Sequence, residues 1–182
     1  SIGGAINGVN VTVTDSTFNN NTADAFGGAI SGNIVTVTNS NFSNNKASEN
    51  GGSIYSDNGV NVTDSTFNNN AAHNGGAVYS NNGNVTVSGS TCNDTTATGS
   101  DGAGGAIFSV NNVTVSDSNF IKTGGNGGAI NGGNVTVKNS NFIDNEAGYG
   151  DAVSIYAQGS LKLEDSTFKS QMPDGYSIIS IK

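Results

Sequence analysis

The chain has 182 residues, of which 14 are acidic and six basic, and its formal net charge is −8. All six basic residues are lysines and five of them lie from Lys122 onward, which makes binding to nucleic acid or to an anionic membrane unfavourable. The single cysteine, Cys92, excludes an internal disulfide.

A segment of about 24 residues recurs along the whole chain. It opens with Gly-Gly-Ala-Ile or a close variant at Gly3, Gly27, Gly51, Gly75, Gly104 and Gly127, with a degraded copy at Gly150 and a remnant at Gly175. Self-similarity at a fixed period in this range is typical of a solenoid, in which each repeat packs only on its neighbours. The repeat therefore predicts the fold class before any single residue is considered.

Each repeat predicts a short strand at the glycine motif, Ala5-Ile6 in the first copy, followed by a longer one. The longer strand begins an eight-residue block that runs from Val11 to Phe18 and recurs seven times without gaps. Apolar and polar residues alternate in its first half, which is typical of a strand with one buried face. The equivalent valines, serines and phenylalanines are expected to stack as rows, with Cys92 buried in the phenylalanine row.

The block also predicts a corner, because Phe18 lies an odd number of residues after Val13 and a continuous strand would place the two on opposite faces. The corner falls at Thr14-Asp15, where the repeats carry turn-forming residues: Asp15, Asp64, Gly89, Asp117 and Asn139. Three short strands and three corners per repeat predict a right-handed parallel β-helix of about seven coils, each of about 24 residues. Residues 1–182 are expected to form one domain, excised from a longer repeat protein.

A second motif, Phe-x-x-Asn, follows the glycine motif in four copies: Phe18/Asn21, Phe42/Asn45, Phe67/Asn70 and Phe142/Asn145. This pairing resembles the repeats of chlamydial polymorphic membrane proteins, and is similar to adhesin-like surface proteins of methanogenic archaea. The resemblance implies a large secreted or cell-surface β-helical protein that mediates attachment. It implies no ligand site.

The residues do not favour an enzyme. Polysaccharide-cleaving β-helices need a basic residue beside acids gathered around calcium, or carboxylates that converge on one point. Here the corner acids alternate with Asn39, Gly89 and Asn139, so successive carboxylates lie roughly 9–10 Å apart. The only histidine, His73, lies in an Asn/Gly loop and is expected to be solvated. We therefore expect no catalytic residue, metal or cofactor.

Two outer surfaces are candidate binding sites. The residue after the isoleucine of the glycine motif should point outward, which predicts an aromatic stripe of Tyr55, Tyr79 and Phe108 suited to sugars or a protein partner. Alternatively, these rings pack on one another or lie under the longest loop, Asn93 to Ala103. The Thr-x-Thr pairs Thr12/Thr14 and Thr36/Thr38 form a hydroxyl array of the kind that ice-binding solenoids present, although threonine also suits any exposed strand.

The resemblance implies an extracellular adhesin-like protein that attaches to another cell surface, a glycan or a protein receptor, and the repeat predicts that this segment is its rigid scaffold. We expect no membrane insertion by this segment. An ice-binding solenoid and a purely structural spacer are the alternatives.

Overall fold

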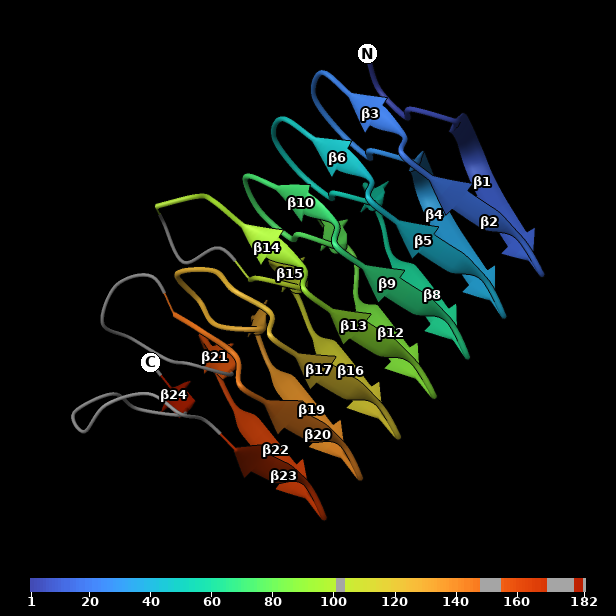
Figure 1. Ribbon diagram of the computed structural model, residues 1–182. Helices are drawn as coiled ribbons and strands as arrows, with labels where there is room; N and C mark the ends of the chain where they lie inside the picture. Colours follow the sequence, from blue (N-terminus) through green and yellow to red (C-terminus); the bar gives the residue numbers. More distant parts are fainter. Residues whose placement is uncertain (101–103, 148–154, 170–178, 182) are drawn as a thin grey trace.

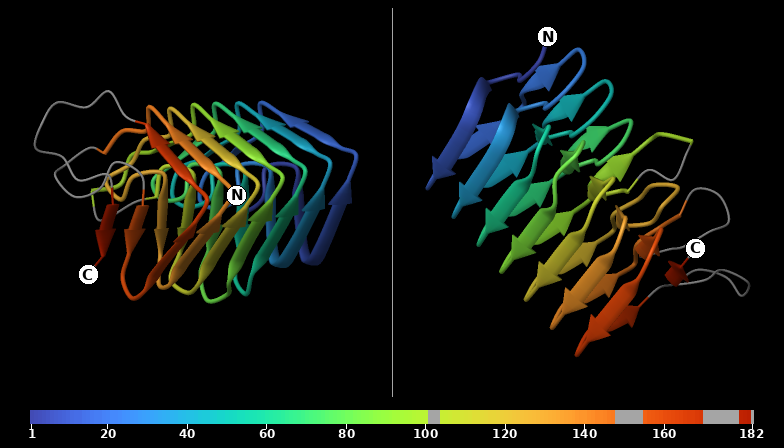
Figure 2. Two further views of the ribbon diagram at one scale, coloured as in Figure 1. Left: turned by 90° about the horizontal axis from the view of Figure 1, so that it is seen from below. Right: turned by 180° about the vertical axis from the view of Figure 1, so that it is seen from behind.

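The computed structural model describes residues 1–100, 104–147, 155–169 and 179–181, and all regular structure in these ranges is β-strand. The strands wind into coils that stack in order from the N-terminal to the C-terminal end (Figure 1). Every strand pair is parallel, and the arrows of each face run the same way in successive coils (Figure 2). Gly150 and Gly175, which open the degraded copy and the remnant, lie outside the described residues.

Two faces share one 13-stranded sheet, because the first two coils each run through both faces as a single strand: β1 (Ile6–Thr14) and β4 (Ile30–Thr38). The glycine-motif face continues with β7 (Ile54–Ser56), β11 (Val78–Ser80), β15 (Ile107–Ser109), β18 (Ile130–Gly132), β21 (Ile155–Ala157) and β24 (Ile179–Ile181). The threonine face continues with β8 (Val60–Thr63), β12 (Val85–Ser88), β16 (Val113–Ser116), β19 (Val135–Lys138) and β22 (Leu161–Glu164).

The phenylalanine face is a seven-stranded sheet: β2 (Thr17–Asn19), β5 (Asn41–Ser43), β9 (Thr66–Asn68), β13 (Thr91–Asn93), β17 (Asn119–Ile121), β20 (Asn141–Ile143) and β23 (Thr167–Lys169). The predicted parallel β-helix of stacked coils is thus confirmed. The structure adds a third, four-stranded sheet of two-residue strands that sequence analysis did not identify: β3 (Thr22–Ala23), β6 (Lys46–Ala47), β10 (Ala71–Ala72) and β14 (Thr96–Ala97).

The corners depend on residues that tolerate a left-handed backbone. At the predicted corner, Asp15 has φ of 50° and Asp64 of 48°, values that Asn, Asp and Gly adopt at the lowest cost. A second left-handed corner, after the phenylalanine face, is occupied by Asn20, Asn44, Asn69, Asp94, Lys122 and Asp144. The sequence predicts three corners per coil but does not place this second one.

The core consists of rows of like residues, as predicted. Val11, Val35 and Val60 lie in register, and the same row continues through Val85, Val113, Val135 and Leu161. In the phenylalanine row, the rings of Phe18, Phe42 and Phe67 stack with centroids 4.8 and 4.9 Å apart, and those of Phe120, Phe142 and Phe168 stack at 4.9 and 4.8 Å. Cys92 interrupts this row and is 2% exposed, which confirms its predicted burial.

Two polar ladders complete the interior. Each corner serine donates its hydroxyl to a carbonyl two residues earlier, as Ser65 does to Thr63. From Ser40 onward, each also accepts the backbone N–H of the serine one coil before, as Ser65 does from Ser40. The asparagines of Phe-x-x-Asn form the second ladder, in which the Asn70 amide oxygen accepts the N–H of Asn45 at 2.9 Å. Buried backbone groups at both corners are therefore hydrogen-bonded by side chains of adjacent coils.

Candidate functional site

The predicted aromatic stripe forms a stacked row on the glycine-motif face. Tyr55, Tyr79 and Phe108 lie in register on β7, β11 and β15, with ring centroids 5.6 and 5.1 Å apart. Phe26, from the preceding corner, extends the row and stacks on Tyr55 at 4.7 Å. The mutual-packing alternative is therefore confirmed.

The rings of this row are less exposed than the predicted outward-facing stripe requires. Tyr55 and Tyr79 are each 9% exposed, because each ring is covered by a ring above and a ring below, while Phe108 is half-buried. Burial also raises the pKa of both tyrosines above the ordinary value, because it disfavours the charged phenolate. A ligand would meet ring edges and hydroxyl groups here rather than open ring faces.

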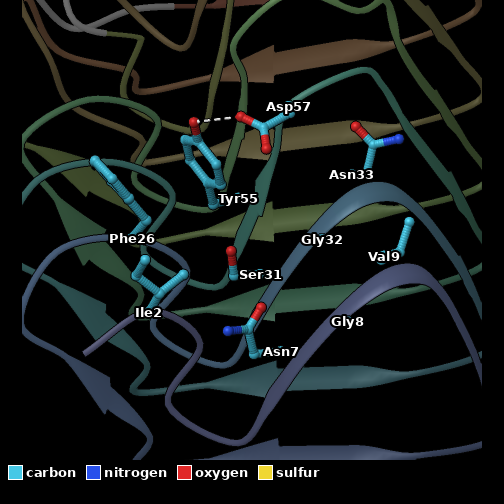
Figure 3. A pocket seen from close by; sticks show the side chains of 10 residues that line it. All are labelled: Ile2, Asn7, Gly8, Val9, Phe26, Ser31, Gly32, Asn33, Tyr55 and Asp57. Atoms are coloured by element: carbon cyan, nitrogen blue, oxygen red, sulfur yellow. Dashed lines mark hydrogen bonds between the residues drawn. The ribbon is translucent and has the colours of Figure 1, made fainter.

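A groove of about 470 Å³ opens where the aromatic row ends (Figure 3). In the first two coils, Asn7 and Ser31 occupy the register position that Tyr55 fills in the third. These short side chains leave a hollow that is lined by Ile2, Asn7, Gly8, Val9, Phe26, Ser31, Gly32, Asn33, Tyr55 and Asp57. Sequence analysis identified only Tyr55 of this set as a site residue.

The groove has an apolar rim and polar groups between its walls. Val9 is 72% exposed and Ile2 is 49% exposed, although both are apolar. The Tyr55 hydroxyl donates to the Asp57 carboxylate at 2.8 Å, and burial together with this bond holds the Tyr55 pKa high. Asp57 is the only charged residue in the lining.

The threonine face presents the predicted Thr-x-Thr pairs in register, with Thr12 beside Thr36 and Thr14 beside Thr38. The first row continues through Asn61, Thr86, Thr114 and Thr136, and the second through Thr63, Ser88 and Ser116. At the C-terminal end, Lys162 donates to Glu164 at 2.6 Å, and this bond lowers the pKa of the Glu164 carboxyl. The two hydroxyl rows thus run together through the first five coils, interrupted by Asn61 in the third. They give way to Lys138 in the sixth coil and to the Lys162–Glu164 ion pair in the seventh.

The corner acids do not converge on a catalytic or metal-binding point. The Asn39 amide donates to Asp15 and the Asn139 amide donates to Asp117, so asparagines separate the carboxylates of successive coils. Among the described residues, no group of three or more His, Cys, Asp and Glu side chains could hold a metal ion. His73 is exposed, as expected.

The described part of the chain contains no helix with the length and hydrophobicity needed to cross a bilayer.

Comparison with protein families gives two matches. A model described as a right-handed β-helix region matches residues 31–180. A model of the Chlamydia polymorphic membrane protein repeat matches residues 15–33, which contain the Phe18/Asn21 motif and the glycine motif at Gly27. The resemblance seen in the sequence is therefore confirmed at this repeat, and no curated protein or solved structure matches the chain.

Proposed function

Because the chain belongs to the right-handed β-helix family, we propose that it is part of an extracellular, adhesin-like surface protein. In this proposal it serves as a rigid scaffold and mediates attachment to cells or glycans. The similarity to the polymorphic membrane protein repeat supports a location at the cell surface.

The observation that carries the proposal is the unbroken register of the coils. Seven strands follow one another on the phenylalanine face, and every described coil is hydrogen-bonded to its neighbours through backbone and side-chain ladders. At about 4.8 Å per strand, these coils form a column on the order of 30 Å long. Such a column holds its outer faces at a fixed distance and orientation from whatever anchors it.

The expected partner is the surface of another cell, presented as a glycan or a protein receptor. The formal charge of −8, with only one lysine before Lys122, disfavours nucleic acid and anionic lipid as partners. The aromatic row of Tyr55, Tyr79 and Phe108 remains the predicted contact, now through ring edges and hydroxyls.

Adhesion of coated beads to cells tests the proposal. Beads that carry the protein should bind to a panel of cells more strongly than beads that carry an unrelated β-helix of equal net charge. If the two kinds of bead bind equally across the panel, the protein is a spacer and the attachment role is wrong.

The threonine face supports ice binding as a second candidate function, because the register places threonine beside threonine over neighbouring coils. An ice-binding protein in dilute solution should shape growing ice crystals into facets. Unmodified disc-shaped growth would refute this candidate, whereas faceting that is lost in Thr36→Lys would support it.

A further inference from the structure

We infer that the groove between Asn7 and Asp57 is the attachment site proper and that it takes an uncharged saccharide. This inference rests on the proposed attachment function and specifies its location and ligand class. It also moves the contact from the middle of the aromatic row to the N-terminal end of that row, where the packing leaves an opening.

The shape of the groove follows from the sequence of the first two coils. Later coils fill this register position with Tyr55 and Tyr79, whereas the first two coils carry Asn7 and Ser31. Phe26, which stacks on Tyr55, lines one side of the groove beside the buried Ser31, while Tyr55 and Asp57 line its end (Figure 3). A volume of about 470 Å³ suits one or two sugar rings lying along the face.

Polar groups without partners face this space. In most of the chain, asparagine side chains bond to one another, as Asn74 does with Asn50 and Asn134 with Asn112. The Asn33 amide is bonded to a described residue only through its oxygen, to Asn58, which leaves its N–H groups free to donate. Amide groups free to donate and accept are those that bind sugar hydroxyls.

Asp57 supplies an acceptor that is already oriented. One carboxylate oxygen accepts the Tyr55 hydroxyl at 2.8 Å, and the other makes no hydrogen bond to a described residue. The bond from Tyr55 fixes the carboxylate, so a ligand hydroxyl gains a charge-assisted bond without ordering a mobile side chain. The exposed apolar side chains of Ile2 and Val9 offer contacts to the C–H groups of a sugar ring.

Charge decides the class of saccharide. The lining contains the Asp57 carboxylate and no lysine, and the protein as a whole is strongly acidic. A uronic acid or sialic acid would place its carboxylate beside Asp57 without a cation to balance it, which costs binding energy. Neutral hexoses and N-acetylhexosamines avoid this repulsion.

The test compares four proteins, the unmodified protein and its variants Asn7→Tyr, Asp57→Ala and Asn61→Tyr. All are applied to one glycan array that carries neutral hexose and N-acetylhexosamine oligosaccharides beside uronate- and sialate-bearing glycans. Asn7→Tyr places a ring in the groove at an exposed position whose register equivalents include Tyr55. Asn61→Tyr makes the same change at an exposed position on the threonine face and is the matched control. Circular dichroism establishes that all four are equally folded.

We expect the unmodified protein and Asn61→Tyr to bind neutral oligosaccharides equally, with affinity at least tenfold lower in Asn7→Tyr and in Asp57→Ala. Unchanged binding by Asn7→Tyr, or binding confined to the anionic glycans, would overturn the inference. The bead assay separates the two proposals. If Asn7→Tyr beads still adhere to cells, the groove is not the binding site, but the attachment function is still supported. If the unmodified protein fails in both assays, both proposals are refuted.

Discussion

Replacing Cys92 with phenylalanine should stabilise this protein, although an enlarged side chain normally disrupts a packed core. Cys92 lies in register between Phe67 and Phe120, each about one strand spacing away. The same coil carries Val78 where its neighbours carry Ile54 and Ile107, so nothing on the glycine-motif face replaces the missing volume.

The expected gain follows from the row itself. Full burial of a phenylalanine side chain contributes about 1.5–3 kcal/mol, and each stacked aromatic pair adds about 0.5–1.5 kcal/mol. Against this stand the lost burial of the cysteine and about 1–3 kcal/mol wherever neighbouring side chains must move. We expect the free energy of unfolding to rise by about 1–2 kcal/mol in Cys92→Phe.

Urea unfolding followed by circular dichroism measures this change, with amide hydrogen exchange at Thr91–Asn93 as a local readout. Phe67→Cys is the reciprocal control and should lower the free energy of unfolding by about 2–4 kcal/mol. A loss of 1 kcal/mol or more in Cys92→Phe, with an unchanged urea dependence, would mean that the adjacent coils have already closed around the cysteine. The register of Cys92 with Phe67 and Phe120 would then not leave room for a third ring.

Three further predictions concern the polar ladders and the tyrosine row. Thr95, whose buried hydroxyl has no hydrogen-bond partner among the described residues, interrupts the asparagine ladder; Thr95→Asn should accept the N–H of Asn70 and raise the free energy of unfolding by about 0.5–1.5 kcal/mol in urea. Ser90→Ala removes the acceptor of the buried Ser65 N–H at 3.0 Å and should cost about 1–3 kcal/mol in the same assay; a change below 0.5 kcal/mol would contradict the ladder. The raised pKa of Tyr55 means that folding favours its neutral form, so this stabilisation is complete below the ordinary value of 10.0 and is lost as the pH rises above it. Unfolding midpoints measured from pH 8 to 11 should fall less steeply in Tyr55→Phe, and identical slopes would argue against this tyrosine as the source.

The coils and their contents follow from the sequence because the period fixes which residues lie above one another. Val11, Val35 and Val60 could be placed in one row without any knowledge of the chain between them. The corner at Asp15 followed from the parity of Val13 and Phe18. The second corner carried an equally clear signal, since Asn20, Asn44 and Asn69 are turn formers at one repeat position, but short strands beside it have too few residues to show alternation.

The accessibility of the aromatic row could not be predicted in the same way. The exposure of Tyr55 depends on Phe26, which stacks on its ring. Phe26 occupies a different position of the repeat, so the repeat pattern does not predict this contact. The groove likewise results from what the first two coils lack, and a short side chain such as Asn7 gives no signal by itself. A row of large residues can be predicted from the sequence, whereas a groove can be identified only when the positions of the surrounding residues are known.

The serine ladder has a direction, and this direction bears on how the protein is made. The backbone N–H of Ser40 is accepted by the hydroxyl of Ser65, which comes later in the chain, and the same order holds from Ser16 to Ser166. A polypeptide that emerges from the ribosome or a secretion channel with its amino end first therefore presents each new turn before the hydroxyl that completes it has appeared. The most recently formed coil therefore always lacks this hydrogen bond, and each added repeat supplies it to the coil before.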